Sequence, residues 1–449
     1  MLVVFDEAAN LDTAVLYWLR RLQRIYNDLP FWSLVLSTNS CILTTVPSNR
    51  KEPRSPTKEC ELRHLEPFLG LQLDVELQKR LGDPSQLQDE LQKPLVRFAS
   101  CDHLTMFGRP LWRLLSNCHQ LAVGDFVRMK LCSGASIDPR NTDHVFAIIA
   151  SRLCLDPPIN PAAAGLVSNA VHRHLRLVVA IDETQTTLTT MTPSEPIVAD
   201  AAASILMSLP RPGADHYWTT CITTFRNRLL QGGLVKKRVD GELYARLIFV
   251  LARDYLTYAS LKADLDYTTS DLAYHSRPFS LLHFLDTLVG SDLSSDSSCL
   301  GPGSVAITGG SDAGRGCALA FRKSFGTALL NFTHFTCTEK RLKPKHRTEL
   351  LHDLMRQCAA LRLSPGQPTW DLLIPMYLGN PNEVMDPERL SAIIVSVTSQ
   401  SVPSSLNAAC GDLGFFAGLS QPAVAISLDL GVDQQGRASL EPELIQHQN

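Results

Sequence analysis

Leu2-Val3-Val4-Phe5-Asp6-Glu7-Ala8 is an apolar run that ends in two adjacent carboxylates. A short, continuous apolar run of this kind predicts a strand that is buried on both faces of a parallel sheet. Because ligands bind at the carboxyl ends of such strands, we expect Asp6 and Glu7 to lie at a ligand-binding edge. In a nucleotide site Asp6 would hold Mg²⁺, and Glu7 would polarise the water that attacks the γ-phosphate. The alternative is an ordinary core strand that stops at a solvated acidic turn.

A second strand is predicted a short distance along the chain. Asp12 is a suitable N-cap for a helix running to about Asn27, and the apolar run that begins at Phe31 ends in Thr38, Asn39 and Ser40. A strand, a helix and a strand form a βαβ unit, so the polar ends of both strands should meet at one edge of a parallel sheet. Thr38 and Asn39 stand where such enzymes place the side chains that sense the γ-phosphate.

A phosphate-binding loop is missing from the sequence. The pattern Gly-x-x-x-x-Gly-Lys-Ser/Thr occurs nowhere, and the glycine-rich stretch 309–316 has Arg315 where the Lys-Ser/Thr pair should follow. Backbone donors and the lysine of that loop supply most of the grip on the β- and γ-phosphates. As written, the chain is therefore expected to bind and hydrolyse ATP poorly.

Composition excludes several classes of protein. The chain has 449 residues, a net charge of -3 and twelve cysteines without a Cys-x-x-Cys pair. The charge gives no overall basic field for nucleic acid or membranes, and the scattered cysteines argue against a disulfide framework or a structural zinc site. No signal peptide and no 18-residue apolar run are evident, so we expect an intracellular protein, cytoplasmic or nuclear, without membrane contact.

The middle of the chain, from about residue 104 to 271, has helical periodicity. Helices are expected from Pro110, over 121–132, 143–154 and 160–173, after a cap at Ser194, and over 242–258, with a short strand at 177–181. The stretch 232–242 predicts a turn, a short basic strand and a new helix. Such a strand among helices would fit a winged helix, although a solvated edge explains its three basic residues as well.

After a Ser-, Asp- and Gly-rich linker at 291–303 the pattern returns to α/β. A helix is predicted over 349–363, and two neighbouring strands over 369–375 and 390–398. An Asp on one strand and an acid-x-Lys on the next is the arrangement of metal-dependent nucleases, in which carboxylates hold Mg²⁺ against the scissile phosphate. Asp371 supplies the first acid, but the second strand offers Ser396-Val397-Thr398, which contains neither an acid nor an amine.

An ordered series of segments resembles fungal Crinkler-type proteins, which join a STAND-like P-loop ATPase to a restriction-endonuclease-like domain. The segments span nearly the whole chain: Val4 to Ala8, Phe31 to Ser40, Gly108-Arg109-Pro110-Leu111-Trp112, Ser194-Glu195-Pro196, Gly241-Glu242-Leu243, Asn331-Phe332-Thr333-His334-Phe335 and Gln367-Pro368-Thr369-Trp370-Asp371.

The resemblance assigns roles to several residues. It implies that Asp6 binds the metal and Glu7 is the catalytic acid of the ATPase, with Thr38 and Asn39 on its phosphate-sensing strand. Gly108 and Pro110 match the Gly-x-Pro element of the helical lid. Asp371 matches the catalytic, metal-binding Asp of the nuclease, and the cofactors of the family are Mg²⁺ and ATP.

The expected fold is α/β, in three parts: a partial parallel-sheet P-loop NTPase core without its phosphate loop (1–100), a helical lid with a winged-helix-like region (101–290), and a degenerate restriction-endonuclease-like α/β domain (304–449).

The chain begins at the acidic strand, and the family's Gln-Val-Lys has become Ser396-Val397-Thr398. These departures predict a truncated, catalytically impaired remnant that binds a partner protein or has an effector-like role, with only weak support for nucleic acid. The alternatives are a Mg²⁺-dependent nuclease, an NTPase completed by another chain, and an unrelated helical scaffold.

Overall fold

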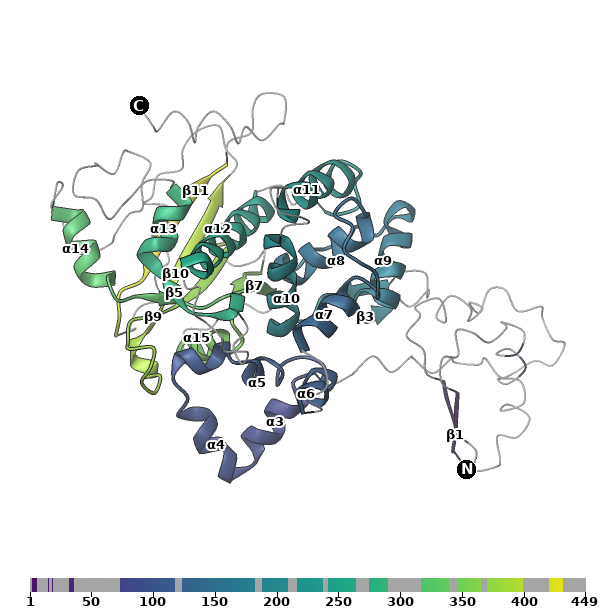
Figure 1. Ribbon diagram of the computed structural model, residues 1–449, viewed down its shortest axis with the longest axis horizontal. Helices are drawn as coiled ribbons and strands as arrows, with labels where there is room; N and C mark the ends of the chain where they lie inside the picture. The colour runs from purple at the N-terminus through teal and green to yellow at the C-terminus, as the bar shows by residue number, and fades with distance from the viewer. Residues whose placement is uncertain are drawn as a thin grey trace.

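The computed structural model describes residues 2–5, 15, 18, 32–35, 73–117, 123–181, 188–208, 216–236, 241–263, 274–289, 316–338, 342, 346–364, 370–398 and 420–430. These residues form a mixed α/β structure with many helices and a mixed sheet (Figure 1). The linker predicted at 291–303 lies outside the described residues, as does nearly all of the helix predicted over 12–27.

The two N-terminal strands pair as the sequence predicts. Strand β1 (Leu2–Phe5) runs parallel to β2 (Trp32–Val35), with Leu2 opposite Trp32 and Phe5 opposite Val35. Figure 1 draws β1 apart from the other labelled elements. The parallel pairing brings the carboxyl ends of both strands to the same edge.

The central part of the chain is helical. Its helices are α3 (Val75–Gly82), α4 (Pro84–Leu91), α5 (Cys101–Leu104), α6 (Pro110–Asn117), α7 (Val123–Leu131), α8 (Thr142–Leu153), α9 (Pro161–Arg173), α10 (Pro196–Met207), α11 (Tyr217–Thr224), α12 (Glu242–Ala263) and α13 (Leu281–Val289), with a 3-10 turn η2 (Leu95–Ala99) and a π-helical turn η3 (Phe225–Leu230). The strand predicted at 177–181 is β3 (Leu177–Ile181), which pairs with β4 (Leu188–Met191) in an antiparallel hairpin.

Capping explains why α8 and α9 begin where they do. The Asn141 side chain accepts hydrogen bonds from the first backbone N–H groups of α8, and Asn160 does the same for α9, which has Pro161 in its first turn. Nearly every residue of α8 is buried, so this helix lies in the middle of the packing. The predicted helices at 143–154 and 160–173 are thereby confirmed.

The C-terminal sheet is mixed. Its strands are β5 (Phe279–Ser280), β6 (Leu329–Leu330), β7 (His334–Cys337), β8 (Ala359–Arg362), β9 (Leu372–Tyr377), β10 (Leu390–Thr398) and β11 (Val424–Asp429), with helices α14 (Gly316–Phe325) and α15 (Arg347–Arg356). Strand β10 is antiparallel to β9 and parallel to β11, while β8 pairs with both β7 and β9. The two strands predicted near 369–375 and 390–398 are therefore neighbours, as expected.

Two sequence predictions are corrected here. The helix predicted over 349–363 ends at Arg356; Cys358 adopts a left-handed backbone angle (φ 48°) and the chain continues as β8. A fully buried strand has a continuous apolar run, which periodicity alone does not separate from a helix. The turn predicted within 232–242 is present at Gly232 and Gly233, but the strand predicted after it is not formed over its described residues, 234–236. There the backbone N–H of Lys236 donates to the carbonyl of Asp156.

One hydrophobic core connects the helical region to the sheet. It runs from Leu95 to Ile426 and includes residues of η2, α8, α10, α12, α15 and the central strands. Figure 1 shows α7 to α11 on one side of the molecule and the sheet with α13 on the other, and α12 contacts both groups. Among the described helices, none combines the length and apolar character that crossing a bilayer requires.

Candidate functional site

Asp371 lies at the start of β9, where three strands come together. Its side-chain Oδ2 accepts a hydrogen bond of 2.6 Å from the backbone N–H of Val397 in β10. Its own backbone N–H donates to Val395, and its carbonyl accepts from Leu363 just after β8. The Asp371 carboxylate therefore joins the end of β10 to the start of β9.

The residues around Asp371 do not fit a bound Mg²⁺. Ser396 and Thr398 stand on β10 at the positions where the predicted nuclease needs an acid and a lysine, and Glu349 is highly exposed and paired with a histidine. Asp429, which the sequence analysis did not single out, lies opposite Thr398 in the β10–β11 register. Mg²⁺ needs several oxygen ligands, and the described residues contain no group of three His, Cys, Asp or Glu side chains suited to a metal.

A chain of hydrogen bonds links Ser194 to the sheet. Ser194 does not cap α10 as predicted: the N-cap is Glu195, and Ser194 Oγ instead lies 2.8 Å from Nε2 of His334. Nδ1 of His334 is 2.9 Å from Oγ1 of Thr333, whose hydroxyl donates to the carbonyl of Cys358. Since the Thr333 proton is committed there, His334 Nδ1 donates to Thr333, and Nε2 accepts from Ser194.

A serine next to a histidine suggests nucleophilic catalysis, but the environment of His334 argues against it. Burial, together with the nearby guanidiniums of Arg152 and Arg253, lowers the pKa of His334 to about 3. A general base works best when its pKa is near the operating pH, so this imidazole is too weak a base to activate Ser194. The hydrogen-bond chain instead connects the start of α10 to β7.

Behind His334 lies a fully buried cluster of charges. Asp254 Oδ1 accepts hydrogen bonds from Arg152 (2.7 Å) and from Arg253 (2.8 Å), and Nε of Arg152 donates to the carbonyl of Thr333 at 2.6 Å. Burial alone would raise the pKa of Asp254, but the two guanidiniums outweigh burial and lower it. The cluster connects α8, α12 and β7, so it ties the helical region to the sheet.

Glu195, at the start of α10, holds the segment from Gly108 to Trp112 in place. Its Oε1 accepts hydrogen bonds of 2.8 Å from the backbone N–H of Arg109 and from the indole N–H of Trp112, and its Oε2 accepts from the Arg109 guanidinium. Gly108 has a left-handed backbone (φ 81°), and a Cβ there would collide with the Glu195 side chain. The glycine of the predicted Gly-x-Pro element is therefore needed to let Glu195 approach.

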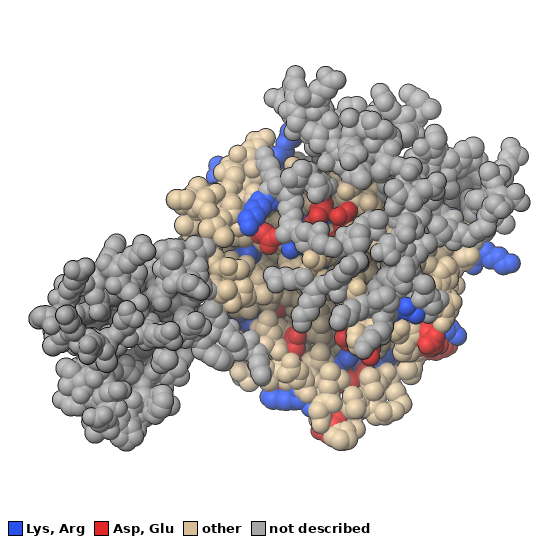
Figure 2. All heavy atoms as spheres, turned by 180° about the vertical axis from the view of Figure 1, so that it is seen from behind, with Lys and Arg blue, Asp and Glu red and all other residues tan. Residues whose placement is uncertain are grey.

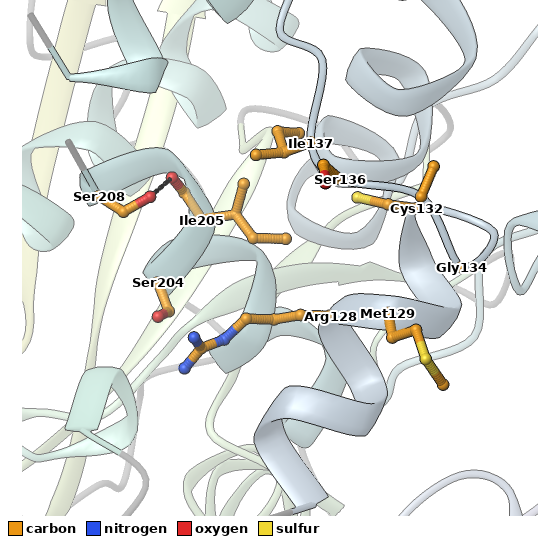
Figure 3. Close-up of a pocket in the computed structure, with 10 residues that line it drawn as sticks. Arg128, Met129, Cys132, Gly134, Ser136, Ile137, Ser204, Ile205 and Ser208 are labelled. Carbon is orange, nitrogen blue, oxygen red and sulfur yellow. Dashed lines mark hydrogen bonds between the residues drawn. The ribbon is translucent and has the colours of Figure 1, made fainter. Parts of the chain in front are cut away.

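A pocket of about 370 Å³ lies between α7 and α10 (Figure 3). It is lined by Arg128, Met129, Cys132, Gly134, Ala135, Ser136, Ile137, Ser204, Ile205 and Ser208. Figure 3 shows the Arg128 side chain extending toward Ser204. Its guanidinium forms an exposed ion pair of 3.3 Å with Asp125. No residue predicted from the sequence lines this pocket.

Charged side chains are mixed on the face drawn in Figure 2. On the described part of that face, lysines and arginines are interspersed with aspartates and glutamates rather than gathered into a stripe. A protein that follows a nucleic-acid backbone needs a basic patch or groove. The described surface in this view shows no such basic patch or groove.

Four of the five predicted site residues, Asp6, Glu7, Thr38 and Asn39, lie outside the described residues. The strands that precede them are described, and their parallel pairing is as predicted. Asp371 is the one predicted site residue within the described residues. It directly precedes β9, which pairs with β10, the strand on which the second acid and the lysine of a nuclease would stand.

The comparisons give no family assignment: no family model, curated protein or solved structure matches this chain.

Proposed function

We propose that this chain is a catalytically impaired relative of the Crinkler-type ATPase–nuclease proteins, and that it acts by binding a partner protein rather than by hydrolysis. The observation that carries the proposal is the set of contacts and neighbours of the Asp371 carboxylate. The resemblance would make this acid the nuclease carboxylate, but it accepts the Val397 N–H, and the neighbouring strand offers Ser396 and Thr398 in place of an acid and a lysine.

Two buried carboxylates of the helical region fit the same proposal. Nuclease chemistry of this type needs two or more carboxylates converging on Mg²⁺ and a basic group near the attacking water. Asp254 is engaged by two arginines, and Glu195 by Arg109 and Trp112. These contacts suit a stable scaffold better than a reaction centre.

A nuclease assay tests the proposal. Purified full-length chain should leave single- and double-stranded DNA and RNA intact in the presence of Mg²⁺ or Mn²⁺, at the level of a blank without protein. Asp371→Ala and Asp429→Ala should show the same background, as should Asp89→Ala, an exposed acid elsewhere on the chain that serves as a control.

Metal-dependent cleavage that is lost in Asp371→Ala and Asp429→Ala but kept in Asp89→Ala would overturn the proposal in favour of a working nuclease. The ATPase alternative is assayed separately by phosphate release from ATP. Hydrolysis that disappears in Glu7→Gln would favour a working NTPase, to which the parallel pairing of β1 and β2 gives its structural support.

A further inference from the structure

Two cysteines meet where α8 packs against the sheet. Cys154 follows the last residue of α8, with a left-handed backbone (φ 54°) and a buried side chain. Cys337 is the last residue of β7 and is half-buried. Helix α8 contacts β7, both thiols are free, and the Cys154 thiol donates a hydrogen bond to the Cys337 sulfur.

Arginines surround this pair. Arg362 lies opposite Cys337 in the β7–β8 register, and its Nη1 donates to Oδ2 of Asp156 at 2.9 Å. Arg246 is buried and donates to the carbonyls of Leu153 and Cys154. Positive charge next to a thiol favours its thiolate form.

The two thiols differ in acidity. The hydrogen bond from Cys154 is the main reason that the pKa of Cys337 is lowered to about 6; Arg362 and Arg246 add to the effect, and burial opposes it. The same hydrogen bond and burial hold the pKa of Cys154 well above its usual value. The hydrogen bond thus favours the thiolate at Cys337 and the thiol at Cys154.

We propose that Cys337 and Cys154 form a redox-active pair that hydroperoxides oxidise to a disulfide. The Cys337 thiolate attacks the terminal oxygen of ROOH; an S–O bond forms, the O–O bond breaks, and RO⁻ leaves and takes a proton from water. This gives sulfenic acid at Cys337. The sulfur of Cys154 then attacks the sulfenic sulfur, an S–S bond replaces the S–O bond, and the departing hydroxide takes the Cys154 proton. Two thiols are oxidised and one peroxide is reduced to an alcohol and water.

The surroundings favour this chemistry over metal binding and over reaction at the other buried cysteines. Adjacent guanidiniums disfavour a cation, and the described residues offer no third His, Cys, Asp or Glu that would complete a metal site with these thiols. Burial raises the pKa of Cys132 to about 11 and those of Cys221 and Cys358 to about 12. These thiols are protonated at neutral pH and should react slowly.

Peptide mapping tests the disulfide directly on the full-length protein. Trypsin releases Cys154 in the peptide 153–173 and Cys337 in the peptide 324–340, and each peptide contains one cysteine. After brief treatment of reduced protein with hydrogen peroxide and blocking of the remaining thiols, we expect these two peptides to appear as one cross-linked species. It should revert on reduction and be missing from protein unfolded in urea before oxidation.

Alkylation of Cys337 tests the thiolate. Its rate in the native protein should rise with pH and reach half its maximum near pH 6, whereas in urea the midpoint should move to the ordinary thiol value of about 8.5. Cys154→Ser keeps a donor and should keep a low midpoint without forming the disulfide, and Cys154→Ala should raise the midpoint. Cys101→Ser, which changes another half-buried cysteine, should change neither.

The proposal is overturned if oxidation yields no 153–173/324–340 cross-link in native protein. It is also overturned if native Cys337 titrates at the unfolded value. Both measurements on the unmutated chain remain decisive even if a variant fails to fold.

Discussion

Replacing Asp254 by alanine should lower the free energy of unfolding by about 3–5 kcal/mol, because it leaves two buried guanidiniums without their shared carboxylate. Arg152, Arg253 and Asp254 have almost no exposed surface. Several of their polar atoms, including Nη1 of Arg152 and Nη2 of Arg253, have no hydrogen-bond partner in the described part of the chain. The single carboxylate is thus the main counter-charge for both cations.

Urea unfolding of the purified variants measures this effect. Asp125→Ala removes an exposed ion pair with Arg128 and should cost less than about 1 kcal/mol, so it controls for the loss of an acid as such. Adding Arg152→Met to Asp254→Ala should recover part of the lost stability, since one unpaired charge is then removed. A loss below about 1 kcal/mol for Asp254→Ala would show that the cluster does not stabilise the fold as we describe.

Mild acid should destabilise the protein strongly. Burial lowers the pKa of His103, His275 and His334 to about 3 in the folded chain, while the ordinary value in an unfolded chain is about 6.5. Above about pH 6.5 each imidazole is neutral in both states, so the full stability is present. As the pH falls from about 6.5 toward 3, only the unfolded state takes up protons, and stability is lost progressively.

The expected size of this effect follows from the number of protons taken up. Each histidine contributes up to about 1.4 kcal/mol per pH unit in this window, so the three together should lower the unfolding free energy by about 6 kcal/mol between pH 7 and 5. Urea unfolding at pH 7, 6 and 5 measures the slope. His334→Asn removes one of the three buried imidazoles, so the number of protons taken up on unfolding should fall by about one and the slope should fall with it. A stability that stays flat from pH 7 to 5 would contradict the burial of these imidazoles.

Much of the local structure is predictable from the sequence. The parallel pairing of the apolar runs at 2–5 and 32–35, the start of α6 at Pro110, and the bounds of β10 all follow from periodicity, proline placement and apolar run length. These signals act over a few neighbouring residues. Where a segment is wholly buried the signal weakens, and for this reason β8 is predicted as the end of a helix.

Long-range polar contacts are not predictable in this way. Arg152 and Asp254 are 102 residues apart, and Ser194 and His334 are 140 residues apart. In the sequence Arg152 and Asp254 look like ordinary helical charges, and Ser194 looks like a helix cap. Gly108 to Trp112, Ser194 to Pro196 and Asn331 to Phe335 are separate segments in the sequence, and no pattern within them predicts that they meet. The structure brings parts of these three segments into contact.

The most direct test of the central claim compares Asp371→Asn with Asp371→Ala by urea unfolding, with and without Mn²⁺. If Asp371 serves to hold β10, asparagine keeps an acceptor for the Val397 N–H and should unfold within about 1 kcal/mol of the original chain. Alanine leaves that N–H unpaired and should cost about 1–3 kcal/mol, and Mn²⁺ should stabilise none of the three proteins. Stabilisation of the original chain by Mn²⁺ that is lost in Asp371→Asn would contradict the account, because it would identify Asp371 as a metal ligand.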